Sequence, residues 1–166
     1  MQLSDYRADP QGAPLATPSG RIELYSPTIA GFGYDDCPPD PSWLEPSEWL
    51  GSAEPDELHL VTNQPAKQLH SQLFQANHTS GPAEVRISPA DAQARKLVDG
   101  EDVRLWNKRG ACMGRALVDK SLRPGALVMP TGAWFAISMD GLEMNGNPNL
   151  LTHDRRTSRL GQAVRL

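Results

Sequence analysis

Two stretches of this 166-residue chain concentrate side chains that both donate and accept hydrogen bonds. The first loop, residues 62–72, reads TNQPAKQLHSQ, and the second loop, residues 146–152, reads GNPNLLT. Amides, hydroxyls and an imidazole suit a ligand edge on which donors and acceptors alternate, as on a heterocyclic ring. From its residues alone, the first loop fits equally well a capped turn whose polar groups satisfy their own backbone. The sequence therefore predicts two candidate binding loops and leaves their role open.

The sequence contains no complete catalytic or metal-ligand motif. It has no GxSxG nucleophile elbow and no HExxH pair. Cys37 and Cys112 lack CxxC spacing, so they indicate neither a zinc site nor a disulfide framework. His59, His78 and His153 have no evident partner group in the sequence, and we interpret them as structural or solvent-facing. We predict a binding domain with no catalytic residue and no metal ligand of its own.

Composition excludes several classes of protein. The formal net charge of −4 argues against a nucleic-acid-binding protein, because such proteins need a basic surface for the phosphate backbone. Hydrophobic residues make up 39% of the chain and charged residues 22%, which predicts a packed core. No apolar run approaches the roughly 18 residues of a membrane span, and the N-terminus has no apolar signal region. We expect no membrane span, and the compartment stays open between cytoplasm and periplasm.

Short elements with tight turns must position the two loops. The sequence predicts a helix that opens at Ser88 and Pro89, continues through Leu97 and stops at Asp99-Gly100. Alternating or β-branched patterns predict strands over residues 58–62, 102–106, 113–118 and 126–130. The first loop directly follows the first of these strands, whereas residues 145–152 are expected to be irregular. The predicted fold class is mainly β with one or two short helices, in a compact β-barrel.

The first third of the chain follows a different pattern. Prolines interrupt residues 1–57 repeatedly, and only residues 21–26 read as a strand. Trp43 and Trp49 argue against a disordered leader, because disordered segments are poor in aromatic residues. We therefore predict an irregular Pro-rich connecting arm over residues 1–57 and a β-barrel domain over residues 58–166.

The chain resembles the C-terminal region of the dimethyl sulfoxide reductase family, in its trimethylamine N-oxide and biotin sulfoxide reductase branch. Five segments carry the resemblance, in the order of the family: TPSGRIELYS (17–26), LVTNQPAKQLHSQL (60–73), SPADAQARKLVDGEDVRLWNKRG (88–110), RPGALVMPTGAW (123–134) and GNPNLLT (146–152). The Pro- and Trp-rich stretch between the first two also looks like the arm that precedes the terminal domain in that branch. Together these segments cover nearly the whole chain.

The resemblance implies a double-psi β-barrel that binds molybdenum bis(molybdopterin guanine dinucleotide). The full protein would be an oxidoreductase that reduces biotin sulfoxide, dimethyl sulfoxide or trimethylamine N-oxide. The residues implied to contact one dinucleotide are Asn63, Gln64, His70, Ser71 and Gln72. The residues implied to face the pterin region are Asn147 and Asn149, with Gln162 nearby.

The resemblance also implies what this chain needs from elsewhere. The metal-ligating serine of this branch lies upstream, so we expect the isolated chain to be inactive and its partners to be the upstream domains of the same enzyme. Relatives continue into a final strand soon after the RLGQA motif (159–163), which leaves open whether the barrel is complete. The alternative reading is a stand-alone molybdopterin-binding subunit that works with a separate catalytic chain, and a third is a structural barrel of unrelated function. The choice of oxide and of molybdenum over tungsten stays open.

Overall fold

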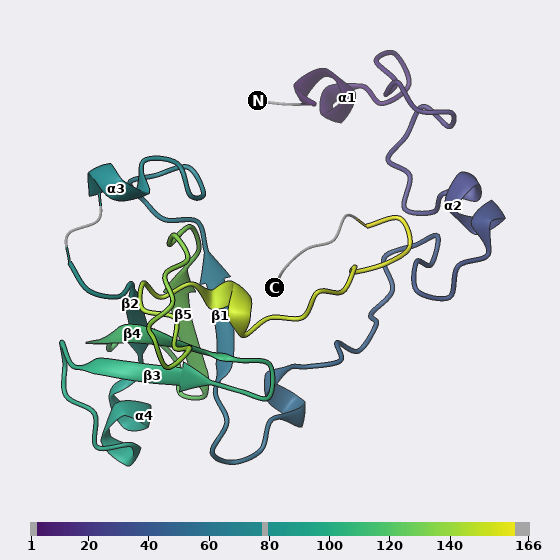
Figure 1. Ribbon diagram of the computed structural model, residues 1–166. Helices are drawn as coiled ribbons and strands as arrows, with labels where there is room; N and C mark the ends of the chain where they lie inside the picture. Colours follow the sequence, from purple (N-terminus) through teal and green to yellow (C-terminus); the bar gives the residue numbers. More distant parts are fainter. Residues whose placement is uncertain (1–2, 78–79, 162–166) are drawn as a thin grey trace. The chain divides into compact units, whose positions relative to one another are not determined.

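The computed structural model describes residues 3–77 and 80–161 (Figure 1). The contacts between residues divide the chain into two compact units. Within the described residues, the N-terminal unit comprises residues 3–45 with 156–161, and the sheet unit comprises residues 46–155. Both candidate loops belong to the sheet unit.

One mixed sheet of five strands forms the sheet unit, in the order β1-β5-β2-β4-β3 (Figure 1). The strands are β1 (His59–Asn63), β2 (Glu84–Ile87), β3 (Asp102–Trp106), β4 (Ala111–Val118) and β5 (Ala126–Pro130). The pairs β1–β5 and β2–β4 are parallel, whereas β2–β5 and β3–β4 are antiparallel. The predicted mainly β fold class is confirmed, and its parallel pairs join strands that are far apart in the sequence.

A small apolar core lies against this sheet. Burial alternates along β4, where every second residue from Cys112 to Ala116 is buried. This period of two places one set of side chains on the core face of the sheet. The core cluster comprises Val85, Leu105, Cys112, Met129 and Leu151. Because Leu151 lies in the second loop, burial of that side chain ties this loop to the core.

Helices occupy opposite ends of the sheet: α3 (Phe74–Asn77) follows the first loop, and α4 (Pro89–Ala94) lies at the other end (Figure 1). The prediction for α4 is confirmed at its start, where the Ser88 hydroxyl accepts a hydrogen bond from the Asp91 N–H at 3.1 Å. The helix ends at Ala94 instead of continuing through Leu97, because Lys96 takes a left-handed conformation with φ 57°. Two 3₁₀ turns complete the unit, η1 (Leu50–Ser52) and η2 (Pro148–Leu150), so residues 145–152 are not wholly irregular as predicted.

The N-terminal unit contains two short helices, α1 (Ser4–Ala8) and α2 (Pro27–Phe32). The strand predicted over residues 21–26 is wrong. Ile22 and Leu24, which would form its buried face, are 62% and 71% exposed, and none of the strands in the described residues pairs with this segment. Alternation without a pairing partner does not make a strand. Among the described residues, no helix has the length and apolar character needed to cross a bilayer.

Candidate functional site

The first loop leaves the sheet beside the end of β5. Asn63 is the last residue of β1 and is paired with Pro130, the last residue of β5. The Thr131 N–H donates to the Asn63 carbonyl at 2.9 Å. Because β1 and β5 are parallel, the segments that follow their carboxyl ends meet at one edge of the sheet. The support segment, residues 131–134, therefore runs alongside the first loop.

The first loop packs closely onto Gly132 of the support segment. Gly132 has φ +93°, and a Cβ there would lie 2.1 Å from the His70 carbonyl oxygen. The Gln68 Nε2 donates to the carbonyls of His70, at 2.8 Å, and of Gly132, at 3.3 Å. The Trp134 indole N–H donates to the Ser71 carbonyl at 2.7 Å. These contacts hold the backbone of the loop, while the side chains of His70, Ser71 and Gln72 stay exposed.

Two residues of this region have unusual backbone conformations. His70 has φ 51° and Leu73 has φ 62°, both in the left-handed region. For a branched residue such as leucine this conformation is uncommon, and such strain persists only where surrounding contacts impose it. The strained pair flanks Ser71 and Gln72, two of the predicted cofactor ligands. This location is typical of a loop shaped for binding.

The second loop is fixed to the same support segment. The Asn147 Nδ2 donates to the Ala133 carbonyl at 2.9 Å, and its Oδ1 accepts from the Asn149 N–H at 3.1 Å, capping η2. Just before the loop, the Asn145 Nδ2 donates to the Trp134 carbonyl at 2.8 Å. The amide of Asn147 is therefore engaged inside the protein, whereas the side chain of Asn149 is exposed.

The support segment thus brings most of the predicted site residues into one region. Asn63, His70 and Ser71 contact it through backbone carbonyls, either directly or through Gln68, and Asn147 through its side chain. Gln64 lies at the start of the first loop, where its Nε2 donates to the Gln68 carbonyl at 3.0 Å. Gln162 lies outside the described residues.

Two surface cavities are lined by residues of neither loop. The first is lined by Gly33, Asp35, Asp36 and Arg159, and the second by Arg104, Ala111, Asp140, Gly141 and Leu142. Within the part of the chain that the structure describes, no three His, Cys, Asp or Glu side chains gather as metal ligands. Neither cavity therefore belongs to the candidate site, which is an exposed surface formed by the two loops.

Sequence reasoning missed Glu143, which is fully buried just before the second loop. One carboxylate oxygen accepts from the N–H groups of Ala136, at 3.3 Å, and Asn145, at 3.0 Å. The other accepts from Gly146, at 2.8 Å, and Asn147, at 2.7 Å. Glu143 is surrounded in the sequence by a mixed loop pattern, GLEMNGN, that gives no sign of this burial.

The buried carboxylate also affects its neighbour Cys112. The two residues form a parallel bridge, and Cys112 is 0% exposed. Burial, together with the nearby charge of Glu143, raises the pKa of the Cys112 thiol to about 12. Cys112 is therefore an uncharged core residue and not a nucleophile.

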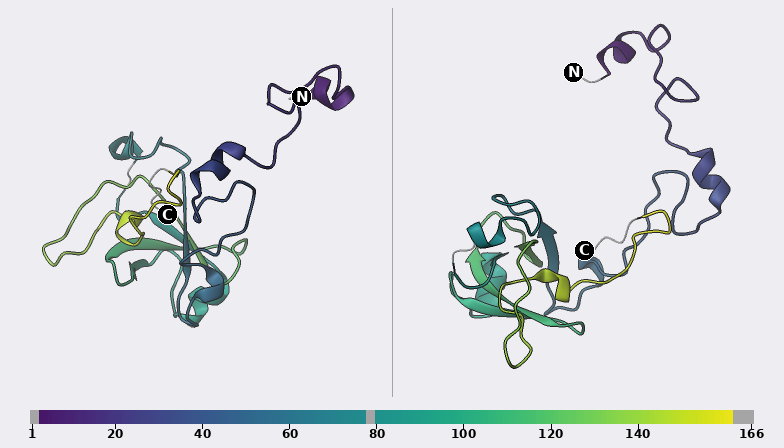
Figure 2. Two further views of the ribbon diagram at one scale, coloured as in Figure 1. Left: turned by 90° about the vertical axis from the view of Figure 1, so that its right-hand side faces the viewer. Right: turned by 45° about the horizontal axis from the view of Figure 1, so that its top comes forward.

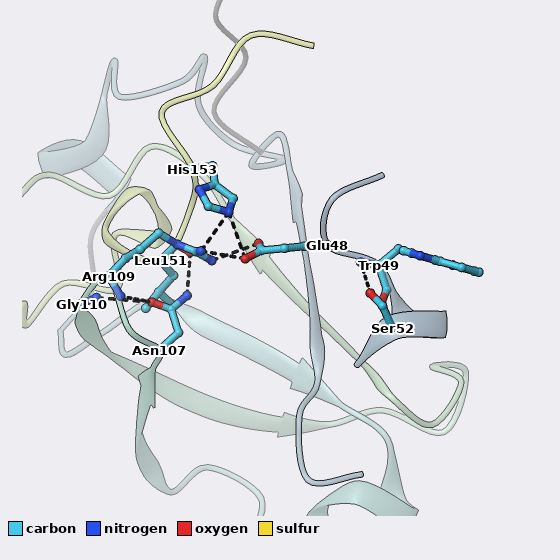
Figure 3. Close-up of polar contacts among 8 residues, drawn as sticks. All are labelled: Glu48, Trp49, Ser52, Asn107, Arg109, Gly110, Leu151 and His153. Atoms are coloured by element: carbon cyan, nitrogen blue, oxygen red, sulfur yellow. Dashed lines mark hydrogen bonds and ion pairs between the residues drawn. The ribbon is translucent and has the colours of Figure 1, made fainter. Parts of the chain in front are cut away.

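The far end of the second loop is anchored by the turn between β3 and β4 (Figure 3). The Asn107 Nδ2 and the Arg109 Nε both donate to the Leu151 carbonyl, at 2.7 and 2.8 Å. The Arg109 guanidinium also donates to both carboxylate oxygens of Glu48, at 2.7 and 3.1 Å. The His153 Nε2 lies 3.0 Å from a carboxylate oxygen of Glu48, a partner that the sequence does not reveal. The hydrogen bond from Arg109 lowers the pKa of Glu48 most, and the nearby His153 lowers it further, against the effect of burial.

Comparison with known proteins identifies the fold around these loops. The family described as Molydopterin dinucleotide binding domain matches residues 58–166, which include both loops and the support segment. The chain belongs to this family. The predicted cofactor class, a molybdopterin dinucleotide, is confirmed by this match.

The relatives of the chain are reductases of sulfoxides and N-oxides. It is 48% identical to biotin sulfoxide reductase and 42% identical to dimethyl sulfoxide/trimethylamine N-oxide reductase, both of Cereibacter sphaeroides. It is 40% identical to trimethylamine-N-oxide reductase 1 of Escherichia coli strain K12. These alignments cover 96%, 98% and 96% of this chain and 22%, 21% and 20% of the relatives, so the chain spans about a fifth of their length. The predicted resemblance to the dimethyl sulfoxide reductase family is confirmed.

A solved structure agrees with the fold. Acetylene hydratase from Pelobacter acetylenicus superimposes with a TM-score of 0.65 at 25% sequence identity. The match covers 89% of this chain and 22% of that protein.

Proposed function

We propose that this chain is the C-terminal cofactor-binding domain of an oxidoreductase that reduces an S-oxide or N-oxide with molybdenum bis(molybdopterin guanine dinucleotide). Its substrate would be biotin sulfoxide, dimethyl sulfoxide or trimethylamine N-oxide. The observation that carries the proposal is the alignment of nearly the whole chain with reductases of these three oxides. The metal ligand and most of the substrate-binding site belong to upstream domains, so the isolated chain is inactive.

The chemistry of the two loops fits such a cofactor. Exposed amide, imidazole and hydroxyl groups of the first loop supply donors and acceptors for the edge of a pterin or guanine ring. The exposed amide of Asn149 supplies the same from the second loop. When bound, the molybdenum centre supplies the transfer of two electrons and an oxygen atom. The chain's own part is to orient the dinucleotide by hydrogen bonds from Asn63, Gln64, His70, Ser71, Gln72, Asn149 and Gln162, with Asn147 bracing its neighbour.

The finer architecture is part of the proposal. We propose that residues 58–166 adopt the double-psi β-barrel fold of the family and that residues 1–57 form a connecting arm. The paired parallel and antiparallel strands and the TM-score against acetylene hydratase support the barrel. The two short helices of the N-terminal unit, separated by proline-rich turns, support the arm.

The proposal is tested by replacing exposed loop side chains in the full-length protein that carries this chain. His70→Ala and Asn149→Ala should each lower the molybdenum and guanine nucleotide bound per polypeptide severalfold, because each removes one or two hydrogen bonds to the cofactor. Lys108→Ala, at an exposed position of the β3–β4 turn, serves as the control. Unchanged molybdenum content in both loop variants would show that the site assignment is wrong.

The size of the native polypeptide separates the two domain arrangements. A band several times larger than 18.1 kDa in an immunoblot of source-cell lysate is the expected result. A band at 18.1 kDa would instead favour a separate molybdopterin-binding subunit with its own catalytic partner chain.

A further inference from the structure

We propose that Glu143 is a positioning residue that holds the second loop in its cofactor-binding shape before the cofactor arrives. This inference rests on the proposed function and adds a residue to it that makes no contact with the cofactor. Glu143 acts through the backbone of residues 145–147 and through Asn147, and it leaves Asn149 to meet the ligand.

The acceptor oxygens of the Glu143 carboxylate match the number and the type of the hydrogen-bond donors around them. It is 0% exposed and accepts from four backbone N–H groups, two on each oxygen. A carboxylate is the side chain that only accepts hydrogen bonds at both of its terminal atoms. Burial of such a group is costly unless its lone pairs are satisfied, so each of the four contacts constrains the backbone that supplies it.

The backbone that Glu143 holds lies directly before Asn149, whose side-chain amide is exposed. The N–H groups of Gly146 and Asn147 point to one oxygen of Glu143. Asn147 then caps η2 by accepting from the Asn149 N–H and donates to the Ala133 carbonyl. The backbone position of Asn149 is thus set by a series of hydrogen bonds that starts at the buried Glu143 carboxylate.

The same carboxylate also holds the residues that follow the support segment, through the Ala136 N–H. The Ala136 N–H lies just after residues 131–134, and it is bound by the oxygen that accepts from Asn145. Figure 2 shows the segment after β5 projecting from the sheet as a long loop before the chain reaches η2. Glu143 closes this loop, because Ile137 and Cys112 also form bridges with it. Both ends of the projecting loop are therefore clamped at one point.

Binding surfaces gain affinity when the binding shape exists before the ligand arrives. The first loop keeps its shape mainly through contacts to the support segment, whereas the second has this buried centre. A glutamine at residue 143 keeps the length and shape of the side chain but turns one acceptor oxygen into a donor NH₂. Two of the four N–H groups would then face another donor, whichever way the amide is oriented.

The test compares Glu143→Gln with the matched control Glu84→Gln, at an exposed position of β2, in the full-length protein. Hydrogen–deuterium exchange is followed in a peptide that spans residues 144–149, and bound molybdenum and guanine nucleotide are measured in the same preparations. We expect Glu143→Gln to speed exchange in this peptide at least about tenfold and to lower cofactor content severalfold. Glu84→Gln should match the wild type in both.

A second measurement keeps the test decisive if Glu143→Gln does not fold. Wild-type protein made in cells that lack the cofactor should already protect the amides of residues 145–147 as strongly as the loaded protein. Fast exchange of these amides in the cofactor-free protein, or wild-type cofactor content in a folded Glu143→Gln variant, would overturn the inference. If the inference is overturned in this way, loss of cofactor in Asn149→Ala would leave the proposed site intact. Retention of cofactor in both Asn149→Ala and His70→Ala would instead show that the proposed site is wrong.

Discussion

The two candidate loops reach the same edge of the sheet but are held in opposite ways. The first loop is exposed, and its backbone is held from the side by Gly132 and Trp134. The second loop is held at its start by the buried carboxylate of Glu143 and at its far end by Asn107 and Arg109. The comparison teaches that two polar loops can share one support and still differ in how much of each is held by buried groups. We call the first loop adaptable and the second loop fixed, as a hypothesis to be tested. Substitutions that break one kind of support and spare the other test this difference.

The largest effect should come from Gly146→Ala in the fixed loop. Gly146 has φ +83°, and a Cβ there would lie 2.7 Å from the Ala83 nitrogen and 2.8 Å from the Met129 Cε, both in tightly packed surroundings. We expect a loss of about 3 kcal/mol in the free energy of unfolding. The control is Gly100→Ala, with φ +80° and open space, which should lose only about 1 kcal/mol. Urea unfolding followed by tryptophan fluorescence measures both, and equal losses would show that the second loop is not fixed by packing.

A smaller and more local effect is expected from Gly132→Ala under the adaptable loop. The new Cβ would collide with the His70 carbonyl, and we expect the first loop to yield by moving outward because most of its residues are exposed. We expect a loss of about 1–2 kcal/mol, with faster hydrogen exchange confined to residues 68–73. Gly141→Ala, with φ +85° and nothing within 4 Å, is the matched control. Global unfolding as severe as that of Gly146→Ala would remove the distinction between the loops.

The smallest effect concerns the anchor at the end of the second loop. The pKa of Glu48 is lowered, chiefly by the hydrogen bond from Arg109, so its charge stabilises the fold above the ordinary pKa of 4.5. This contribution is lost as the pH falls through the lowered pKa of the folded state. Because Glu48 is 52% exposed, Glu48→Gln should cost only about 0.5 kcal/mol at pH 7. The difference in melting temperature from wild type should shrink as the pH falls below 4.5 and Glu48 becomes protonated in the folded state. Glu54→Gln, at another exposed glutamate of this unit, is the matched control.

Local signals explain how much of the fold was predictable. β1, β3, β4 and β5 were expected from alternation, and the start of α4 from a serine cap followed by proline. β2 was missed because its four residues, EVRI, give too short an alternation to stand out. Residues 21–26 gave a longer alternation and formed no strand, because pairing depends on a neighbour that the local sequence does not encode.

The candidate site was also predictable only in part, because local sequence marks its loops but not the contacts that hold them. The polar composition of the two loops marked them in the sequence, and the family resemblance named individual ligands within them. The buried role of Glu143 and the structural role of the Asn147 amide arise only when the support segment and the second loop meet. A residue type in isolation gives no measure of such burial. Tertiary contacts, rather than composition, separate the exposed polar residues of the two loops from the residues that hold them.

The parallel pairing of β1 with β5 sets the time at which this surface can form during protein synthesis. Asn63 leaves the ribosome long before its neighbours Pro130 and Thr131, and the first loop has no support until those residues are made. Closing such a long stretch of chain is slow compared with forming a hairpin. A nascent chain that stops after β4 carries the polar residues of the first loop without the scaffold that shapes them. The first loop can therefore take its final shape only after residues 126–134 have been synthesised.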